Sequence, residues 1–330
     1  MFDIPSISVS GFPRVLVAAL VLVLLPACKE KAMQQASNAY RKGDYDQAIV
    51  YYGEAIRLSP RSDFAYSGRA SAYMAKRDAD NAIADLDKAI SINPSAPTSY
   101  AGRGWCFLLK NNFDKAVSDF SEALKLDPGN VNTLCSRASA YASKKEFEPA
   151  LADLKKAIQL DVGHANAYQL RGLVHLTMKN FDQAMVDLKE ANQLEPQSAI
   201  HYYNLASGYE AMEDHKLAIE SLEAAISRDS KLAQAYNDLA WIYATAQKTE
   251  FRNGTKAVEY AQKACELSEW KQPNAIDTLA AAYAETGDFE KAVQYQKRYL
   301  ETSGVPEDAM TRGRARLDLF ENHKPYRADR

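Results

Sequence analysis

Residues 63–96 read DFAYSGRASAYMAKRDADNAIADLDKAISINPSA, and the landmarks of this segment return every 34 residues along most of the chain. Arg69 is followed by a small residue, and the same pair recurs at Arg103, Arg137 and Arg171. The small residue extends the pattern in both directions, at Ala36, Ala70, Gly104, Ala138, Gly172, Ala206 and Ala240. A fixed period of this length indicates an array of stacked supersecondary units.

Two alanine columns and a closing residue keep the same register. The first column is Ala48, Ala82, Ala116, Ala150, Ala184 and Ala218, and the second is Ala55, Ala89, Ala123, Ala157, Ala191 and Ala225. Each unit closes at Pro60, Pro94, Pro128, Val162, Pro196 or Ser230. Small side chains allow two helices to approach closely, and proline cannot continue a helix. The sequence therefore predicts repeats of two short antiparallel helices.

Large aromatic residues occupy two further repeated positions. One column holds Tyr66, Tyr100, Tyr168, Tyr202 and Tyr236, and the other holds Tyr73, Phe107, Tyr141, Tyr209 and Tyr243. With the period and the small columns, this pattern over about residues 29–305 resembles the tetratricopeptide repeat. The resemblance implies an all-α fold, namely a right-handed superhelical solenoid of about eight helix-turn-helix units with a C-terminal capping helix.

The period predicts the organisation of the whole chain. A leader covers residues 1–27, the array covers 28–305, and a capping helix with a tail covers 306–330. The repeats lie near 29–62, 63–96, 97–130, 131–164, 165–198, 199–232, 233–272 and 273–305. Residues 244–254 interrupt the seventh repeat and are expected to form a loop between its helices, since insertions in such arrays gather on one face.

The terminal helix is expected to cover the end of the array, as repeat proteins require. Leu317, Leu319 and Phe320 are the predicted covering face. The basic residues Arg312, Arg314, Arg316, Lys324, Arg327 and Arg330 are interpreted as the solvated side of this helix and tail.

The first 28 residues are predicted to carry a targeting signal. Val15 to Leu25 is an aliphatic run that spans only about 16 Å as a helix, against ~30 Å of hydrocarbon, so a signal-peptide core fits better than a membrane span. Leu25-Pro26-Ala27-Cys28 resembles a bacterial lipobox, which implies lipidation at Cys28. An ordinary signal peptide with an incidental cysteine is the alternative. Because Lys29 is not aspartate, the resemblance implies the outer membrane, facing the periplasm.

The arginine column has a partner column 16 residues later. Its members are Asp85, Asp119, Asp153 and Asp187, while repeats without the arginine also lack the aspartate. Joint gain and loss favours charge-assisted pairing between helices, within one repeat or between neighbours. A row of arginines that binds acidic ligands is the functional alternative.

The composition and the motifs argue against several classes of function. Lys and Arg number 40 against 43 Asp and Glu, a net charge of −3, without the basic excess of a nucleic-acid binder. No phosphate-binding, nucleophile-elbow or zincin motif occurs, and the five histidines and four cysteines lack metal spacing. We therefore expect no catalysis, cofactor, metal or nucleic acid.

The resemblance implies that the first helix of each repeat lines a concave groove that binds peptides. Its predicted lining is Phe64, Trp105, Leu108, Asn132, Asn166, Gln169, Leu173, Tyr203, Asn237 and Trp241. Trp105 and Trp241 are candidate hot spots because buried tryptophan dominates many interfaces. Packing of both tryptophans between repeats is the alternative.

The favoured hypothesis is a non-catalytic, lipid-anchored scaffold at the bacterial cell envelope that binds protein or peptide partners. One alternative is an enzyme or an enzyme subunit with a catalytic site hidden in the repeats or the insertion. Another is a structural protein that associates with itself through its terminal repeats.

Overall fold

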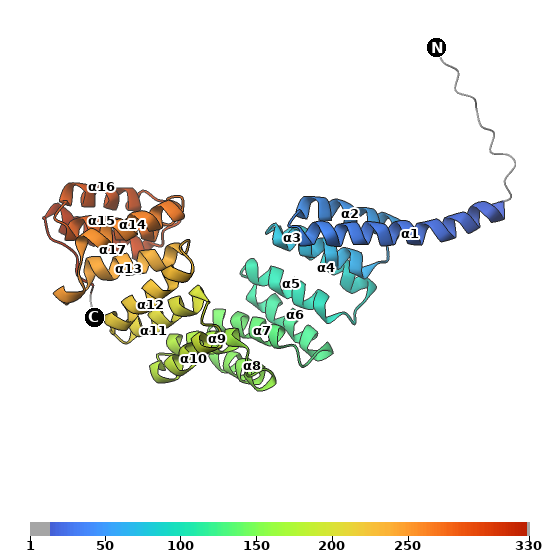
Figure 1. Cartoon of the computed structure of the whole chain (residues 1–330), viewed down its shortest axis with the longest axis horizontal. Coiled ribbons are helices and arrows are strands. Elements are labelled where there is room, and N and C mark those ends of the chain that lie inside the picture. Colours follow the sequence, from blue (N-terminus) through green and yellow to red (C-terminus); the bar gives the residue numbers. More distant parts are fainter. Residues whose placement is uncertain (1–13, 329–330) are drawn as a thin grey trace, which may run out of the picture. The chain divides into compact units, whose positions relative to one another are not determined.

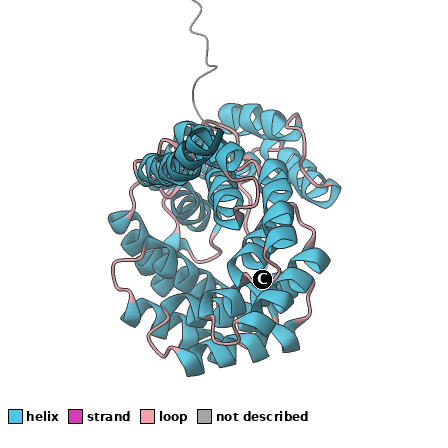
Figure 2. Cartoon of the chain, turned by 90° about the vertical axis from the view of Figure 1, so that its right-hand side faces the viewer, coloured by secondary structure: helices cyan, strands magenta, loops and turns pink. Residues whose placement is uncertain are grey.

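The computed structural model describes residues 14–328, and side chains from residue 27 onward. Within this part the chain forms helices joined by loops, without a strand (Figure 2). The predicted all-α fold of consecutive helix pairs is therefore confirmed. Residues 1–13 of the predicted leader lie outside the described residues. The backbone of the aliphatic run, Val15 to Leu25, belongs to the first turns of helix α1 (Arg14–Arg41). No helix in the described part is long and apolar enough to cross a membrane.

The chain divides into an N-terminal block, Met1–Asp161, and a C-terminal block, Val162–Arg330. In the N-terminal block each odd-numbered helix packs on the helix that follows it (Figure 1). The pairs are α1 with α2 (Tyr45–Leu58), α3 (Asp63–Ala75) with α4 (Ala79–Ile92), α5 (Pro97–Leu109) with α6 (Phe113–Leu126), and α7 (Val131–Ser143) with α8 (Phe147–Leu160).

The C-terminal block continues the same pairing and adds a single last helix. Its pairs are α9 (Ala165–Thr177) with α10 (Phe181–Leu194), α11 (Ala199–Ala211) with α12 (His215–Arg228), α13 (Ala233–Thr245) with α14 (Gly254–Leu267), and α15 (Pro273–Glu285) with α16 (Phe289–Leu300). The short 3-10 helix η1 (Thr249–Phe251) lies in the predicted insertion, and α17 (Glu307–Glu321) packs on α16.

The small-residue columns lie at the contact between the paired helices. The alanines of the columns that begin at Ala48 and at Ala55 are at most 2% exposed. At Gly104 the helices approach so closely that a Cβ there would meet the Phe120 ring at 2.9 Å. The glycine therefore leaves room for a phenylalanine at a position where the two neighbouring repeats hold Leu86 and Leu154.

A left-handed residue closes the first helix of nearly every repeat. The positive-φ positions in these turns are Gly43, Arg77, Asn111, Lys145, Lys179, Glu213 and Gly287. In each turn the next N–H returns to a carbonyl of the preceding helix, as Asp78 does to Tyr73 at 2.9 Å. In the seventh repeat the N–H of Asn253 reaches the carbonyl of Tyr243 at 2.9 Å. The insertion is thereby looped out, and the helix register resumes after it.

The last helix covers the array differently from the prediction. Phe320 is fully buried and Leu319 is partly buried against the core. Arg316, which was expected to be solvated, is 6% exposed and donates to both carboxylate oxygens of Asp277 at 3.0 and 2.7 Å. The basic residues therefore do not share one solvated face, because α17 turns Arg316 towards α15.

Candidate peptide-binding site

The structure brings the eight ladder residues together in four pairs. Each arginine on a first helix donates to both oxygens of the aspartate on the second helix of the same repeat, at 2.7–2.8 Å. The aspartate side chains are 4–10% exposed and the arginine side chains 21–25%. The hydrogen bonds to Asp119 raise the pKa of Arg103 above its ordinary value. Bidentate pairs of this kind tie the two helices together.

Neighbouring repeats add contacts to the same guanidinium groups. Arg103 also pairs with Asp87 of the preceding repeat, and Arg137 donates to the hydroxyl of Ser121 at 3.0 Å. Aromatic rings lie 5.6–5.9 Å from the guanidinium carbons, with Tyr168 nearest to its arginine. The arginines are thus engaged within and between repeats, an arrangement that fits the structural interpretation better than a row of anion sites.

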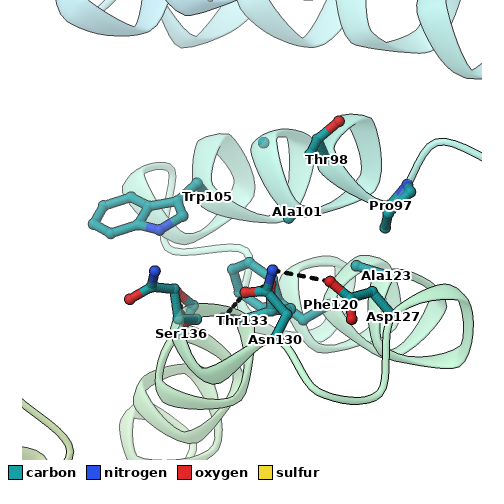
Figure 3. A pocket seen from close by; sticks show the side chains of 12 residues that line it. Pro97, Thr98, Ala101, Trp105, Phe120, Ala123, Asp127, Asn130, Thr133 and Ser136 are labelled. Atoms are coloured by element: carbon teal, nitrogen blue, oxygen red, sulfur yellow. Dashed lines mark hydrogen bonds between the residues drawn. The ribbon is translucent and has the colours of Figure 1, made fainter. Parts of the chain in front are cut away.

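The predicted groove residues Trp105 and Asn132 line one pocket of the N-terminal block. The pocket has a volume of about 230 Å³ and lies between α5, α6 and α7. Figure 3 shows the Trp105 indole on the α5 side and Thr133 and Ser136 on the α7 side. Trp105 remains 46% exposed. A large aromatic face beside small polar groups can hold an apolar anchor and bind a peptide backbone.

Asn130 shapes the floor of this pocket. Its side-chain oxygen accepts from the N–H and the hydroxyl of Thr133 at 3.0 and 2.9 Å. Its amide donates to Asp127 at 3.1 Å, and this bond is drawn in Figure 3. Asn130 is the N-cap of α7, so the start of this helix and the pocket wall are fixed by the same side chain.

The other predicted groove residues are distributed along both blocks. In the N-terminal block Phe64 on α3 is 74% exposed, whereas Leu108 on α5 is partly buried against Phe120 and Ala140. In the C-terminal block Asn166 on α9 is exposed, and Gln169 and Leu173 on that helix are partly buried. Of the ten predicted residues, the Trp105 pocket is lined by Trp105 and Asn132.

Tyr203 and Asn237 meet at Asp238, which the sequence did not single out. The Asn237 amide donates to Asp238 at 2.9 Å, and the Tyr203 hydroxyl also hydrogen-bonds this carboxyl group. Burial raises the pKa of Asp238, although both hydrogen bonds lower it. Asp238 lines a pocket of about 200 Å³ together with Glu210 and Trp241.

Trp241 packs against the chain's own C-terminal segment. Its ring lies 5.8 Å from that of Tyr326, and the Arg316 guanidinium lies 5.7 Å from its centre. Both tryptophans line pockets, but Trp241 is covered in part by the ring of Tyr326, whereas Trp105 is 46% exposed.

Potential metal ligands do not cluster in the described residues, and Cys106 and Cys135 are buried. No group of three or more His, Cys, Asp or Glu residues is placed to hold a metal in residues 14–328. Burial raises the pKa of Cys106 and Cys135 to about 11, which leaves these thiols protonated and weakly nucleophilic at neutral pH.

Sequence reasoning missed two long-range ion-pair centres in the C-terminal block. Asp277 binds Arg316, and Glu285 pairs with Arg252 at 3.0 Å and with Arg327 at 2.7 Å. Asp277 occupies the same repeat position as Gln169 and Asn237, and the other repeats have uncharged residues there. The single acid at this position was therefore the sequence signal that could have indicated a special partner. Its partner has no repeat position and could not be found from the period.

Comparison with known proteins agrees with this architecture. Tetratricopeptide repeat family models match residues 33–97 and 68–131, and also 131–161, 165–198, 202–232 and 274–304. The chain belongs to the tetratricopeptide repeat family. No curated protein matches the chain significantly.

Solved structures show the same tetratricopeptide fold. A tetratricopeptide repeat protein from Parabacteroides merdae is 15% identical, with coverage of 90% of this chain and 100% of that one and a TM-score of 0.59. Yeast Tom70 is 19% identical, the match covers 84% of this chain and 60% of Tom70, and the TM-score is 0.61. PilW, a type IV pilus biogenesis factor, is 19% identical, the match covers 63% of this chain and 96% of PilW, and the TM-score is 0.57. At these identities the likeness concerns the fold alone, and the chain spans 60% of Tom70.

Proposed function

We propose that this protein is a non-catalytic scaffold that binds a partner peptide in the Trp105 pocket and is anchored at the bacterial cell envelope through Cys28. The tetratricopeptide fold supports a role in protein interaction. The observation that carries the peptide site is Trp105, a tryptophan that lines a pocket and is 46% exposed.

The shape and lining of the pocket favour a peptide over a small molecule. Its volume of about 230 Å³ is below the roughly 300–1,000 Å³ of typical small-molecule sites. It suits one apolar anchor side chain, with Thr133 and Ser136 beside the peptide backbone.

The anchor rests on the N-terminal pattern and on Cys28. Cys28 is exposed, and helix α1 runs through it to Arg41. The first repeat therefore begins at the proposed anchor with no linker, and the array would lie close to the membrane. Lipidation with more than one acyl chain gives stable attachment. We propose the outer membrane, on its periplasmic face, as the location.

Trp105→Ala tests the peptide site. Binding partners captured from envelope extracts with the wild-type chain are expected to be lost, because truncating an interface tryptophan often costs ~2 kcal/mol or more. Leu109→Ala is the matched control, since Leu109 lies on the same helix, is 51% exposed and does not line the pocket. Equal capture by Trp105→Ala and wild type, at equal thermal stability, would refute the site.

Cys28→Ala tests the anchor separately. In cells supplied with a labelled fatty acid, the wild-type protein is expected to carry the label and to sediment with membranes. The variant is expected to lose both properties. Persistent labelling of Cys28→Ala would contradict the proposed lipidation site.

A further inference from the structure

The C-terminal segment Tyr326–Ala328 follows α17 and binds the end of α13. After α17 the chain reverses at His323, which has a φ of 55°, and the N–H of Lys324 returns to the carbonyl of Leu319 at 2.9 Å. The following residues, 324–328, are not helical. Their contacts resemble those of a bound peptide more than those of a helix in a repeat.

The contacts combine main-chain and side-chain recognition. The N–H of Ala328 donates to the carbonyl of Thr245 at 3.1 Å, and the carbonyl of Ala328 accepts from the Gln247 side chain at 3.1 Å. Arg327 pairs with Glu285 at 2.7 Å. The Tyr326 ring lies against Trp241 and beside Arg316 at 5.4 Å.

The insertion in the seventh repeat makes this site available. Elsewhere, the left-handed turn satisfies the last carbonyls of the first helix, as the N–H of Arg77 does for Met74 at 2.9 Å. In α13 the insertion replaces that turn, and the carbonyls of Ala244 and Thr245 accept from Arg327 and Ala328. Unsatisfied carbonyls and the negative end of a helix favour an incoming N–H and a cation.

The receiving surface is held independently of the C-terminal segment. Arg252 donates to the carbonyls of Ala246 and Gln247 at 3.1 and 2.7 Å and pairs with Glu285 at 3.0 Å. Glu285, which is 13% exposed, therefore keeps a partner if Arg327 leaves. Arg327 itself is 33% exposed, and partly exposed pairs are weak. The pair of Arg327 and Glu285 is thus suited to replacement by the arginine of another peptide.

We propose that the end of α13, Gln247 and Glu285 form a second peptide-binding site, which takes a non-helical segment with an aromatic residue followed by arginine. The chain's own Tyr326–Ala328 is its competing intramolecular ligand. This inference takes only the class of ligand, a peptide, from the proposed function. It does not depend on the Trp105 pocket, because the two sites share no residue. A pocket of about 400 Å³, lined by Trp241, Gln247 and Ala328, adjoins the bound segment.

The test uses the full chain and a fluorescent peptide that spans Lys324–Arg330. Arg327→Glu is expected to release the segment, because it places a second carboxylate beside Glu285. This variant is expected to bind the peptide at least tenfold more tightly than wild type, in which the tethered segment competes at a high effective concentration. Lys324→Glu makes the same charge change at an exposed position and is expected to bind like wild type. The peptide with glutamate in place of Arg327 is expected not to bind.

Two further variants keep the outcome decisive. Adding Trp105→Ala to Arg327→Glu is expected to leave the affinity for the peptide unchanged. The second site can therefore be refuted independently of the Trp105 site. Tyr326→Ala is expected to release the segment without a charge change, because it removes the ring that lies against Trp241 and leaves the receiving surface intact. Equal or absent peptide binding in wild type, Arg327→Glu and Tyr326→Ala would overturn the proposal. A wild-type dimer by light scattering that Arg327→Glu dissociates would also overturn it, in favour of exchange between two copies.

Discussion

At the scale of single residues, the ladder arginines link helices that otherwise meet through alanine. Arg137 donates to Asp153 and Ser121, which lie on the second helices of two successive repeats. The Arg137 side chain is 21% exposed and that of Asp153 is 10% exposed. The pair is therefore intermediate between a surface ion pair and a fully buried one.

Arg137→Ala is expected to lower the free energy of unfolding, because it leaves Asp153 without its charged partner. The loss should lie below the ~3–5 kcal/mol of a fully buried broken pair, and above the ~0–1 kcal/mol of a surface pair. Thermal unfolding measures it. Replacing both partners, with Arg137→Met and Asp153→Leu, is expected to cost less than the single change. An unchanged melting curve for Arg137→Ala would contradict this role.

Asp238 supplies a pH dependence of stability. Burial raises the pKa of its carboxyl group in the folded protein above the ordinary 3.8, so the folded state binds the proton more tightly than the unfolded state. The contribution to stability is present when the group is protonated and is lost as pH rises from about 3.8 through the raised pKa.

Asp238→Asn is therefore expected to raise the melting temperature at pH 7 and to have little effect near pH 4. Melting temperatures across this range test the sign. Glu220→Gln removes a charge from an exposed position on α12 and serves as the control. A variant that loses stability at pH 7 would show that the charged form is favoured.

At the scale of the helix pair, the ring of Phe120 packs closely against the facing helix at Gly104. Gly104 faces Phe120, whereas Ala70 and Ala138 accompany Leu86 and Leu154 at the same repeat positions. The extra volume of the ring is accommodated by the missing methyl group. This pairing explains why a helix interior tolerates glycine, which alone costs about 1 kcal/mol relative to alanine.

Gly104→Ala is expected to destabilise the protein by about 1–3 kcal/mol, the usual cost of overpacking a core, despite the gain in helix propensity. The new Cβ would lie 2.9 Å from a fully buried ring. Adding Phe120→Leu is expected to restore stability, since it recreates the alanine and leucine combination of the neighbouring repeats. Denaturant unfolding of the single and double variants measures both effects; a stabilising single change would refute the clash.

At the scale of the whole molecule, each block is a linear array whose repeats contact their neighbours. Stability in such arrays depends on interfaces between adjacent repeats, so an end needs a cover. In the C-terminal block α17 supplies it with Phe320, which is fully buried, and with the buried pair of Arg316 and Asp277.

Phe320→Ala is expected to destabilise this end by roughly 3–5 kcal/mol, the usual cost of truncating a buried phenylalanine. Hydrogen exchange should accelerate in α15, α16 and α17 and remain unchanged in α3 to α6. Leu317→Ala alters a partly exposed residue of the same helix and is expected to have a smaller effect. Uniform acceleration along the chain would show that the array unfolds as one unit.

The sequence by itself determined the helix pairs and the pairing of Arg69, Arg103, Arg137 and Arg171 with aspartates. These contacts join residues 16 positions apart and recur with the period, so repetition reveals them without any knowledge of the fold. The left-handed turns recur likewise, but residues such as Lys145 and Glu213 give no glycine signal for them.

Only the tertiary structure decided the environment of Trp241, Arg316 and Arg327. Their partners lie far along the chain: Asp277 and Arg316 are 39 positions apart, and Ala244 and Arg327 are 83 positions apart. Each contact occurs once and lies where the period is broken, at the insertion and beyond the last repeat. A non-repeating contact leaves no periodic trace in one sequence, because it depends on where the chain returns in space. The peptide-like binding of Tyr326–Ala328 was therefore visible only once the helices were placed.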